Sequence, residues 1–184
     1  MKLSRQSTLR PILRMAGHGG AVAILFVAVL VRPQQTTNPQ QTPNPYQMPI
    51  PFGVPVSLDN AKKAAAAAAA EATKNGWTMA VAIVDPNGTL IYYEKMDNTQ
   101  NGSAVVAIDK ARSAALFKRP TKAFEDLLGQ DAAGARYLKM EGALPIEGGI
   151  PLVMSGKIVG AIGVSGGESA QDTQCAELGA NALK

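Results

Sequence analysis

Two residue types that most often build catalytic and metal sites are nearly missing from this sequence. Histidine occurs once, as His18, and cysteine occurs once, as Cys175. A chain with one cysteine cannot form an intramolecular disulfide, and Ser–His or Cys–His catalysis needs a histidine within the folded domain. The acidic residues do not cluster at metal-ligand spacing either. The sequence therefore argues against a triad hydrolase and against a dedicated metal centre.

Positive charge is also scarce once the beginning of the chain is set aside. Eighteen basic and fourteen acidic residues give a formal net charge of +4. Five basic residues and no acidic residue fall within positions 1–32, so the remainder carries about one net negative charge. Nucleic-acid binding needs a basic stripe that follows phosphates. We therefore expect no nucleic-acid partner.

Residues 1–32 have the order of an export signal. A basic segment precedes the apolar run 21–31, and Arg32 follows this run. Eleven residues are too few to span a bilayer as a free helix. No A-x-A-like cleavage site is present, so a cleaved signal peptide and an uncleaved N-terminal anchor both stay open. We expect export to the periplasm or the outside, with membrane contact only through an uncleaved leader.

The next segment and the domain that follows differ sharply in composition. Residues 33–55 are rich in Pro, Gln, Asn and Thr, which is typical of a semi-extended linker. Residues 56–184 carry the patterns of a folded domain. Helices are predicted over 58–74, with Ser57 as the N-cap, and over 103–117, 121–128 and 169–183, where Ser169 and Asp172 have capping-box spacing. Residues 131–142 show at most a helical turn.

Two hairpins complete the expected domain. The first joins 78–84 to 89–96, and the second joins 150–154 to 158–164 through Ser155-Gly156. Pro151 cannot donate a backbone hydrogen bond, which places its strand at a sheet edge. The run 158–164 is apolar at nearly every position, as in a strand covered on both faces. These elements predict an α+β domain with one antiparallel sheet between helical layers.

Several residues of this domain are candidates for a ligand site. Asp97 ends a strand and Lys110 lies on the next helix, so the two could converge on one pocket. Lys110 could then hold an anionic ligand group, the two could act as an acid–base pair, or they could form a plain salt bridge or remain two solvated charges. Gly148 and Gly149 either open the backbone to a ligand or only turn the chain into an edge strand. Ser165 begins a Gly-rich turn before a helix, which resembles an anion-binding nest. Cys175 lies in an apolar helical pattern that favours a buried thiol.

The assembled motifs resemble the GlcG/HbpS family, which includes the C-terminal domain of PduO. The resemblance spans the whole folded domain and rests on these residues: Val84-Asp85, Met96-Asp97, Lys110-Ala111, Gly148 to Pro151, Gly160 to Gly166, and Gln171-Asp172. It implies a profilin-like three-layer α/β/α fold with a five-stranded antiparallel sheet. It also implies a homo-oligomer and a haem or related tetrapyrrole ligand. We add Met96 and Asp97 to the candidate ligand-binding residues. The low aromatic content agrees with a modest monomer core that subunit contacts would complete.

The sequence departs from the family pattern at residues that matter for the ligand. Lys95 stands where the family has Arg, and Asn98 where it has Gly. No histidine lies in the domain, so the commonest haem ligand is missing. The remaining chemically suitable ligands are Tyr92, Tyr93, Tyr137, Met96, Met140, Cys175 and Lys110. We expect an exported small-molecule-binding module first, a structural or sensory accessory homo-oligomer second, and an enzyme using Asp97 and Lys110 third.

Overall fold

The computed structural model describes residues 50–130 and 132–184. Contacts within the chain divide it into residues 1–39 and 40–184, and every described residue belongs to the second unit. The elements are α1 (Leu58–Lys74), β1 (Ala80–Val84), β2 (Leu90–Lys95), α2 (Asn101–Phe117), α3 (Lys122–Gln130), the 3-10 helix η1 (Ala132–Lys139), β3 (Gly149–Met154), β4 (Lys157–Ser165) and α4 (Ser169–Asn181). The predicted leader at 1–32 lies outside the described residues.

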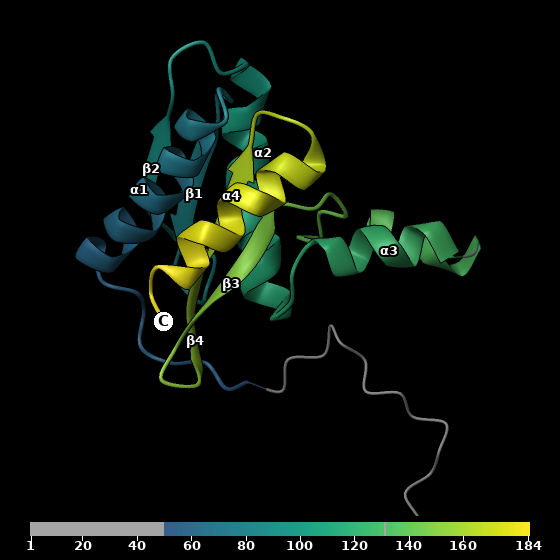
Figure 1. The fold of residues 1–184 in the computed structure, drawn as a ribbon. Helices are drawn as coiled ribbons and strands as arrows, with labels where there is room; N and C mark the ends of the chain where they lie inside the picture. Colours follow the sequence, from purple (N-terminus) through teal and green to yellow (C-terminus); the bar gives the residue numbers. More distant parts are fainter. Residues whose placement is uncertain (1–49, 131) are drawn as a thin grey trace, which may run out of the picture. The chain divides into compact units, whose positions relative to one another are not determined.

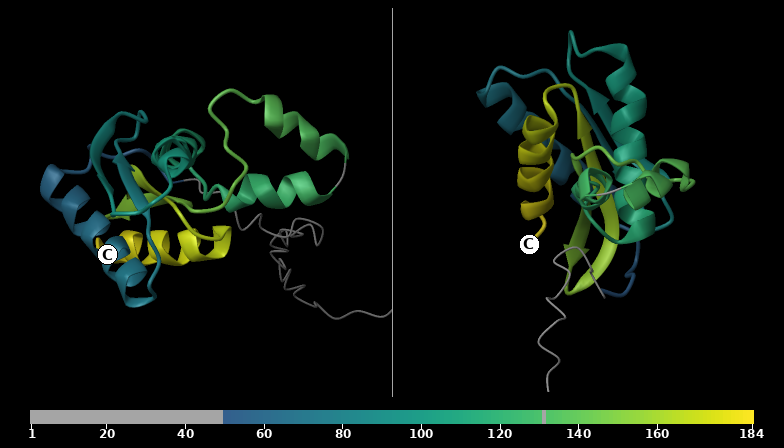
Figure 2. Two further views of the ribbon diagram at one scale, coloured as in Figure 1. Left: turned by 90° about the horizontal axis from the view of Figure 1, so that it is seen from above. Right: turned by 90° about the vertical axis from the view of Figure 1, so that its right-hand side faces the viewer.

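One antiparallel sheet separates two helical layers, which confirms the predicted α+β class. Its strand order is β2-β1-β4-β3. Helices α1 and α4 pack together on one face, and α2 covers the other (Figure 1, Figure 2). Side chains of β1 alternate between the layers: Val81 and Ile83 join α1 and α4, while Ala80 and Ala82 join α2. Because the α2 side is built from alanines, that helix lies close to the sheet.

The two predicted hairpins are present, and the second provides an open sheet edge. In β1–β2 the pairing runs from Ala80 opposite Lys95, and in β3–β4 from Gly149 opposite Gly163. Ser155 and Gly156 both have positive φ, 49° and 71°, as a two-residue hairpin turn requires. Strand β3 is at the edge of the sheet, as predicted from Pro151. This edge forms one wall of the site described below.

The sheet of the described residues has four strands, so the expectation of five was wrong. The stretch that would supply a further strand forms the 3-10 helix η1 and turns instead. The part of β4 that extends beyond the end of β1 contacts the segment before α1. There Gly53 N donates to Ile158 O (2.8 Å) and Val56 N donates to Val159 O (2.8 Å). This contact stays a single parallel bridge at Phe52. Prolines 51 and 55 flank the bridge and have no N–H to extend a ladder.

The helix caps agree with the sequence at α1 and differ at α4. Ser57 accepts a hydrogen bond from Asn60 N at 3.3 Å, as predicted. At α4 the reciprocal capping box joins Glu168 and Gln171 rather than Ser169 and Asp172. Asp172 is unavailable as a cap partner because its carboxylate points into the protein interior. No helix among residues 50–130 and 132–184 is long and apolar enough to cross a membrane.

Candidate functional site in a groove beside strand β3

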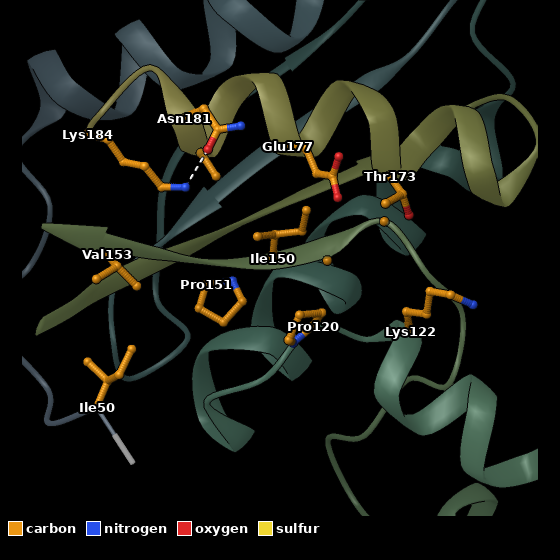
Figure 3. A pocket seen from close by; sticks show the side chains of 13 residues that line it. Ile50, Pro120, Lys122, Ile150, Pro151, Val153, Thr173, Glu177, Asn181 and Lys184 are labelled. Carbon is orange, nitrogen blue, oxygen red and sulfur yellow. Dashed lines mark hydrogen bonds between the residues drawn. The ribbon is translucent and has the colours of Figure 1, made fainter. Parts of the chain in front are cut away.

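A groove with a volume of about 710 Å³ runs along the open edge of β3 (Figure 3). One wall is α4 from Thr173 onward, and the opposite wall begins at Pro120. Its floor is apolar, with Ile150, Pro151 and Val153 from β3. Ligand pockets in proteins commonly have volumes of roughly 300–1,000 Å³ and mostly apolar walls. The groove is therefore large enough for a small organic ligand.

The polar groups of the groove come chiefly from one face of α4. Thr173, Glu177 and Asn181 recur every four residues, so they follow one another along the same side of the helix. Glu177 has its carboxylate directed toward Ile150, and Lys184 has its ammonium directed toward β3 (Figure 3). The groove therefore combines an apolar floor with a hydroxyl, a carboxylate, an amide and an ammonium in order along one rim.

Gly148 and Gly149 line the inner end of this groove. Gly149 N donates to Thr121 Oγ1 (2.9 Å), and Gly149 O accepts from Thr121 N (3.0 Å), so this residue also fixes the beginning of the edge strand. Gly148 has a φ of +113°, and a side chain there would come within 2.9 Å of Lys110 Nζ. The pair therefore turns the chain into the edge strand, and the space that side chains at these two positions would need is taken by Lys110 and Thr121. A role in opening the backbone to a ligand stays a prediction.

Lys110 forms a buried ion pair with Asp172 rather than with Asp97. Its Nζ lies 2.6 Å from Asp172 Oδ2 and donates to Val164 O at 3.0 Å. The two side chains are only 1% and 4% exposed. Burial raises the pKa of Asp172, against the opposing effects of Lys110 and of the backbone N–H groups of Gly167 and Gly166. The predicted acid–base pairing of Asp97 with Lys110 is thus not formed.

The predicted anion nest after Ser165 is filled by a carboxylate of the chain itself. Ser165 is buried at the end of β4, and Gly167 N donates to Asp172 Oδ1 at 3.0 Å. One carboxylate thus receives the Lys110 ammonium on one oxygen and the glycine backbone on the other. An external anion would have to displace Asp172 to reach either group.

Met96 and Asp97 lie elsewhere, in the turn between β2 and α2. Met96 N donates to Met79 O (2.9 Å), and the Met96 side chain packs at the margin of the core shared with α1 and α4. Asp97 is exposed. The structure therefore distributes the six predicted site residues over three places, and only Gly148 and Gly149 line the groove. A ligand-binding role for Met96, Asp97, Lys110 and Ser165 stays a prediction.

Cys175 is fully buried, as expected from its helical pattern. Burial, with smaller contributions from Glu71 and Asp172, raises the pKa of its thiol to about 11. A thiol with such a pKa is protonated at neutral pH and is a poor nucleophile. The described part of the chain also contains no group of three or more His, Cys, Asp or Glu that could hold a metal ion.

Sequence reasoning missed the residues of α4 that form the rim of the groove. Thr173, Glu177 and Asn181 have a regular spacing of four, which was the available signal. That spacing alone describes any solvated helix face. It becomes a site only because β3 is an edge strand and leaves the space beside this helix open.

The fold is a three-layer α+β domain with a groove beside its edge strand β3. Residues 56–181 match the family model described as haem degrading protein HbpS-like, and the chain belongs to this HbpS-like family. It is 36% identical to Protein GlcG of Escherichia coli over 100 residues, which cover 54% of this chain and 73% of the relative.

Solved structures show the same relationship. A double mutant of HbpS from Streptomyces reticuli is 34% identical and has a TM-score of 0.65, with 72% of this chain and 89% of that chain covered. A complex of PduOC with haem is 26% identical and has a TM-score of 0.64, with 71% and 96% covered. The sequence resemblance to the GlcG/HbpS family is thereby confirmed.

Proposed function

We propose that this chain is a binding module for a tetrapyrrole, haem or a related molecule, and that the ligand occupies the groove between β3 and α4. The groove itself carries this proposal, because its volume of about 710 Å³ and its apolar floor suit a large flat ligand. The family supports the ligand class, since a relative has been solved as a haem complex. Burial of the apolar faces would supply most of the affinity.

Lys184 is the proposed partner of the ligand's carboxylates. Its ammonium points toward β3 beside the Asn181 amide, and its contacts among the described residues include no carboxylate side chain (Figure 3). Lys122 at the other end already lies 2.9 Å from Asp126 Oδ1 and 3.8 Å from Glu147 Oε2. Lys110, the residue favoured from the sequence, is buried and paired with Asp172.

The groove fits the tetrapyrrole body better than it fits an iron ion. Protein side chains that hold haem iron are His, Cys, Met or Tyr. None of these types is among the described residues that line the groove. Ile150, Pro151, Val153 and Ala180 would contact the ring, and Lys184 would orient its acid groups. The iron of a bound haem would then receive no strong ligand from these residues.

An absorption titration of the full chain with haemin and with metal-free protoporphyrin tests this proposal. Both should bind at tens of micromolar or tighter with similar affinity, and the haemin spectrum should differ from that of a bis-histidine haem. Lys184→Ala should weaken both by roughly tenfold, for a loss of about 1.4 kcal/mol. Protoporphyrin dimethyl ester, which lacks carboxylates, should not respond to this change.

The matched control for this titration is Lys63→Ala, which removes an exposed ammonium from α1 outside the groove. Absence of binding by either porphyrin would contradict the proposal. The accessory homo-oligomer, which needs no bound ligand, would then be the function that the fold supports.

We also propose that residues 1–32 direct export of the module. The basic-then-apolar order of this segment and the nearly neutral remainder support the proposal. Fractionation of cells that produce the full chain should find it outside the cytosol. A product confined to the cytosol would contradict export and leave the binding proposal unaffected.

A further inference from the structure

Strand β2 forms the second edge of the sheet, on the side away from β3 (Figure 1). Its pairing with β1 is regular over residues 92–95, and the register shift of this hairpin falls nearer the turn. Met96 N donates to Met79 O at 2.9 Å, so the backbone of Met96 faces β1. Because backbone groups alternate in direction along an antiparallel strand, the N–H and C=O of Lys95 and of Tyr93 point away from β1. Among residues 50–130 and 132–184, none pairs with these four groups.

The two edges of the sheet differ in what their backbones offer to another strand. On β3, Thr121 already pairs with the outward N–H and C=O of Gly149, at 2.9 and 3.0 Å. Pro151, two residues on and therefore facing the same way, has no N–H. The six residues of β2, LIYYEK, include no proline. Proteins protect exposed edges with proline, bulges or charged side chains, because an open edge is a template for pairing with another chain. The sheet is therefore closed to a further strand at β3 and open to one at β2.

The two charged side chains of β2 do not protect its edge, because each is held within the chain. Lys95 Nζ donates to Thr99 O (3.0 Å) and to Asn101 Oδ1 (2.9 Å), which draws the ammonium toward the beginning of α2. Glu94 Oε2 accepts a hydrogen bond from Tyr92 Oη at 2.9 Å. A strand that approached β2 would meet open backbone groups rather than a free charge.

We propose that β2 pairs with β2 of a second copy of this chain, antiparallel across a two-fold axis at Tyr93. The two four-stranded sheets then join into one continuous sheet. In this register Tyr93 lies opposite Tyr93 of the partner subunit, and the two residues exchange both backbone hydrogen bonds. Glu94 lies opposite Tyr92 of the partner subunit, the kind of phenol donor that it already accepts from within its own chain. The edge is thus self-complementary, as a two-fold interface requires.

The neighbouring registers are less favourable. An axis at Glu94 would place two carboxylates directly opposite each other, and like charges in that position are destabilising. An axis at Tyr92 would place Lys95 opposite residue 89, which lies before the beginning of β2. The outward groups of Lys95 would then find no strand to pair with. The axis at Tyr93 avoids both faults.

Cysteine cross-linking of the full chain tests this contact. Residues that exchange both backbone hydrogen bonds have Cα atoms about 5.5 Å apart, which is within the range that a disulfide spans. Tyr93→Cys should therefore give a covalent dimer on mild oxidation, and a reducing agent should reverse it. Leu90→Cys is the matched control on the same strand, because about 20 Å would separate its two copies in this register. Cys175 is buried and does not compete for the oxidant.

Light scattering provides a second measurement. The N–H of Tyr93 points away from β1, so Tyr93→Pro removes no hydrogen bond of the β1–β2 pairing and blocks only the outer edge. This variant should have about half the molar mass of wild type. Tyr93→Thr keeps the N–H and should retain the wild-type mass.

Three results would overturn the proposal: a monomeric wild type, a Tyr93→Cys variant that forms no covalent dimer, or a Leu90→Cys variant that cross-links equally well. A folded Tyr93→Pro variant with the mass of wild type would overturn it too. The cross-link decides the matter if Tyr93→Pro does not fold. Porphyrin binding is independent of these outcomes, because the groove lies at the other edge of the sheet.

Discussion

The ammonium nitrogen of Lys110 lies 2.6 Å from Oδ2 of Asp172, and this contact joins helices that cover opposite faces of the sheet. Lys110 belongs to α2 and Asp172 to α4. The pair passes the end of β4, where Val164 O accepts a second hydrogen bond from the same ammonium. A side chain at position 148 would collide with the ammonium nitrogen of Lys110, so the ion pair requires glycine at this position. The pair thus ties all three layers together next to the inner end of the groove.

Lys110→Met should destabilise the protein strongly. Removing one member of a buried ion pair leaves the other charge without compensation, which costs about 3–5 kcal/mol. The double variant Lys110→Met, Asp172→Leu should recover most of that loss because no buried charge remains. Urea denaturation measures both. A single variant within about 1 kcal/mol of wild type would show that the pair is not buried in solution.

The loss in Lys110→Met should depend on pH. Without the ammonium, burial dominates and the pKa of Asp172 rises further above its ordinary value. The folded variant then binds a proton that the unfolded chain releases at lower pH, so its stability falls as pH rises through that range. Urea melts between pH 4 and 8 should show a loss that is largest at pH 8. A pH-independent difference from wild type would contradict this account.

Cys175 should make the protein sensitive to alkaline pH. The thiol ionises near pH 9 in the unfolded chain and near 11 in the folded protein, so the unfolded state is favoured progressively between these values. Stability should fall by up to about 2–3 kcal/mol over this window. Cys175→Ala should show a shallower slope between pH 9 and 11, whatever its stability at pH 7. Equal slopes would place the thiol in contact with solvent.

The proposed homo-oligomer has a candidate contact on the outer face of α2. Val105 and Leu116 are three turns apart on the same side of this helix and are 62% and 46% exposed. Val105→Lys with Leu116→Lys should lower the molar mass that light scattering reports, because lysines there would need to be desolvated. Val54→Lys changes another exposed apolar residue, 81% exposed, and serves as the control. A wild-type monomer at micromolar concentration would contradict the oligomer itself.

Local patterns sufficed for the helices and hairpins. Helix α1 has the predicted bounds and the predicted N-cap Ser57, and Pro151 correctly indicated an edge strand. The number of strands could not be predicted from local patterns. Residues 51–56 run beside β4, but the two prolines in this segment have no N–H to extend the pairing, so only a bridge forms. Whether an irregular segment joins a sheet depends on which strand edge is left open, and this follows only from the assembled fold.

The site was predicted less well, for a related reason. Lys110 and Asp172 are 62 residues apart, and only packing on both faces of the sheet brings them together. Asp97 precedes Lys110 by thirteen residues and seemed the nearer partner, yet it is exposed. Gly148 and Gly149 were identified because two adjacent glycines mark unusual backbone. Thr173 was not, because a lone threonine on a polar helix face carries no local signal.

Blocking the floor of the groove tests the central claim most directly. Val153 lies in the groove beside Pro151, and Val153→Glu places a charge where the tetrapyrrole face would rest. Titration of metal-free protoporphyrin into this variant should show at least tenfold weaker binding than wild type. Val54→Glu, which adds the same charge outside the groove, should bind like wild type. Equal affinities for wild type, Val153→Glu and Val54→Glu would contradict binding beside β3.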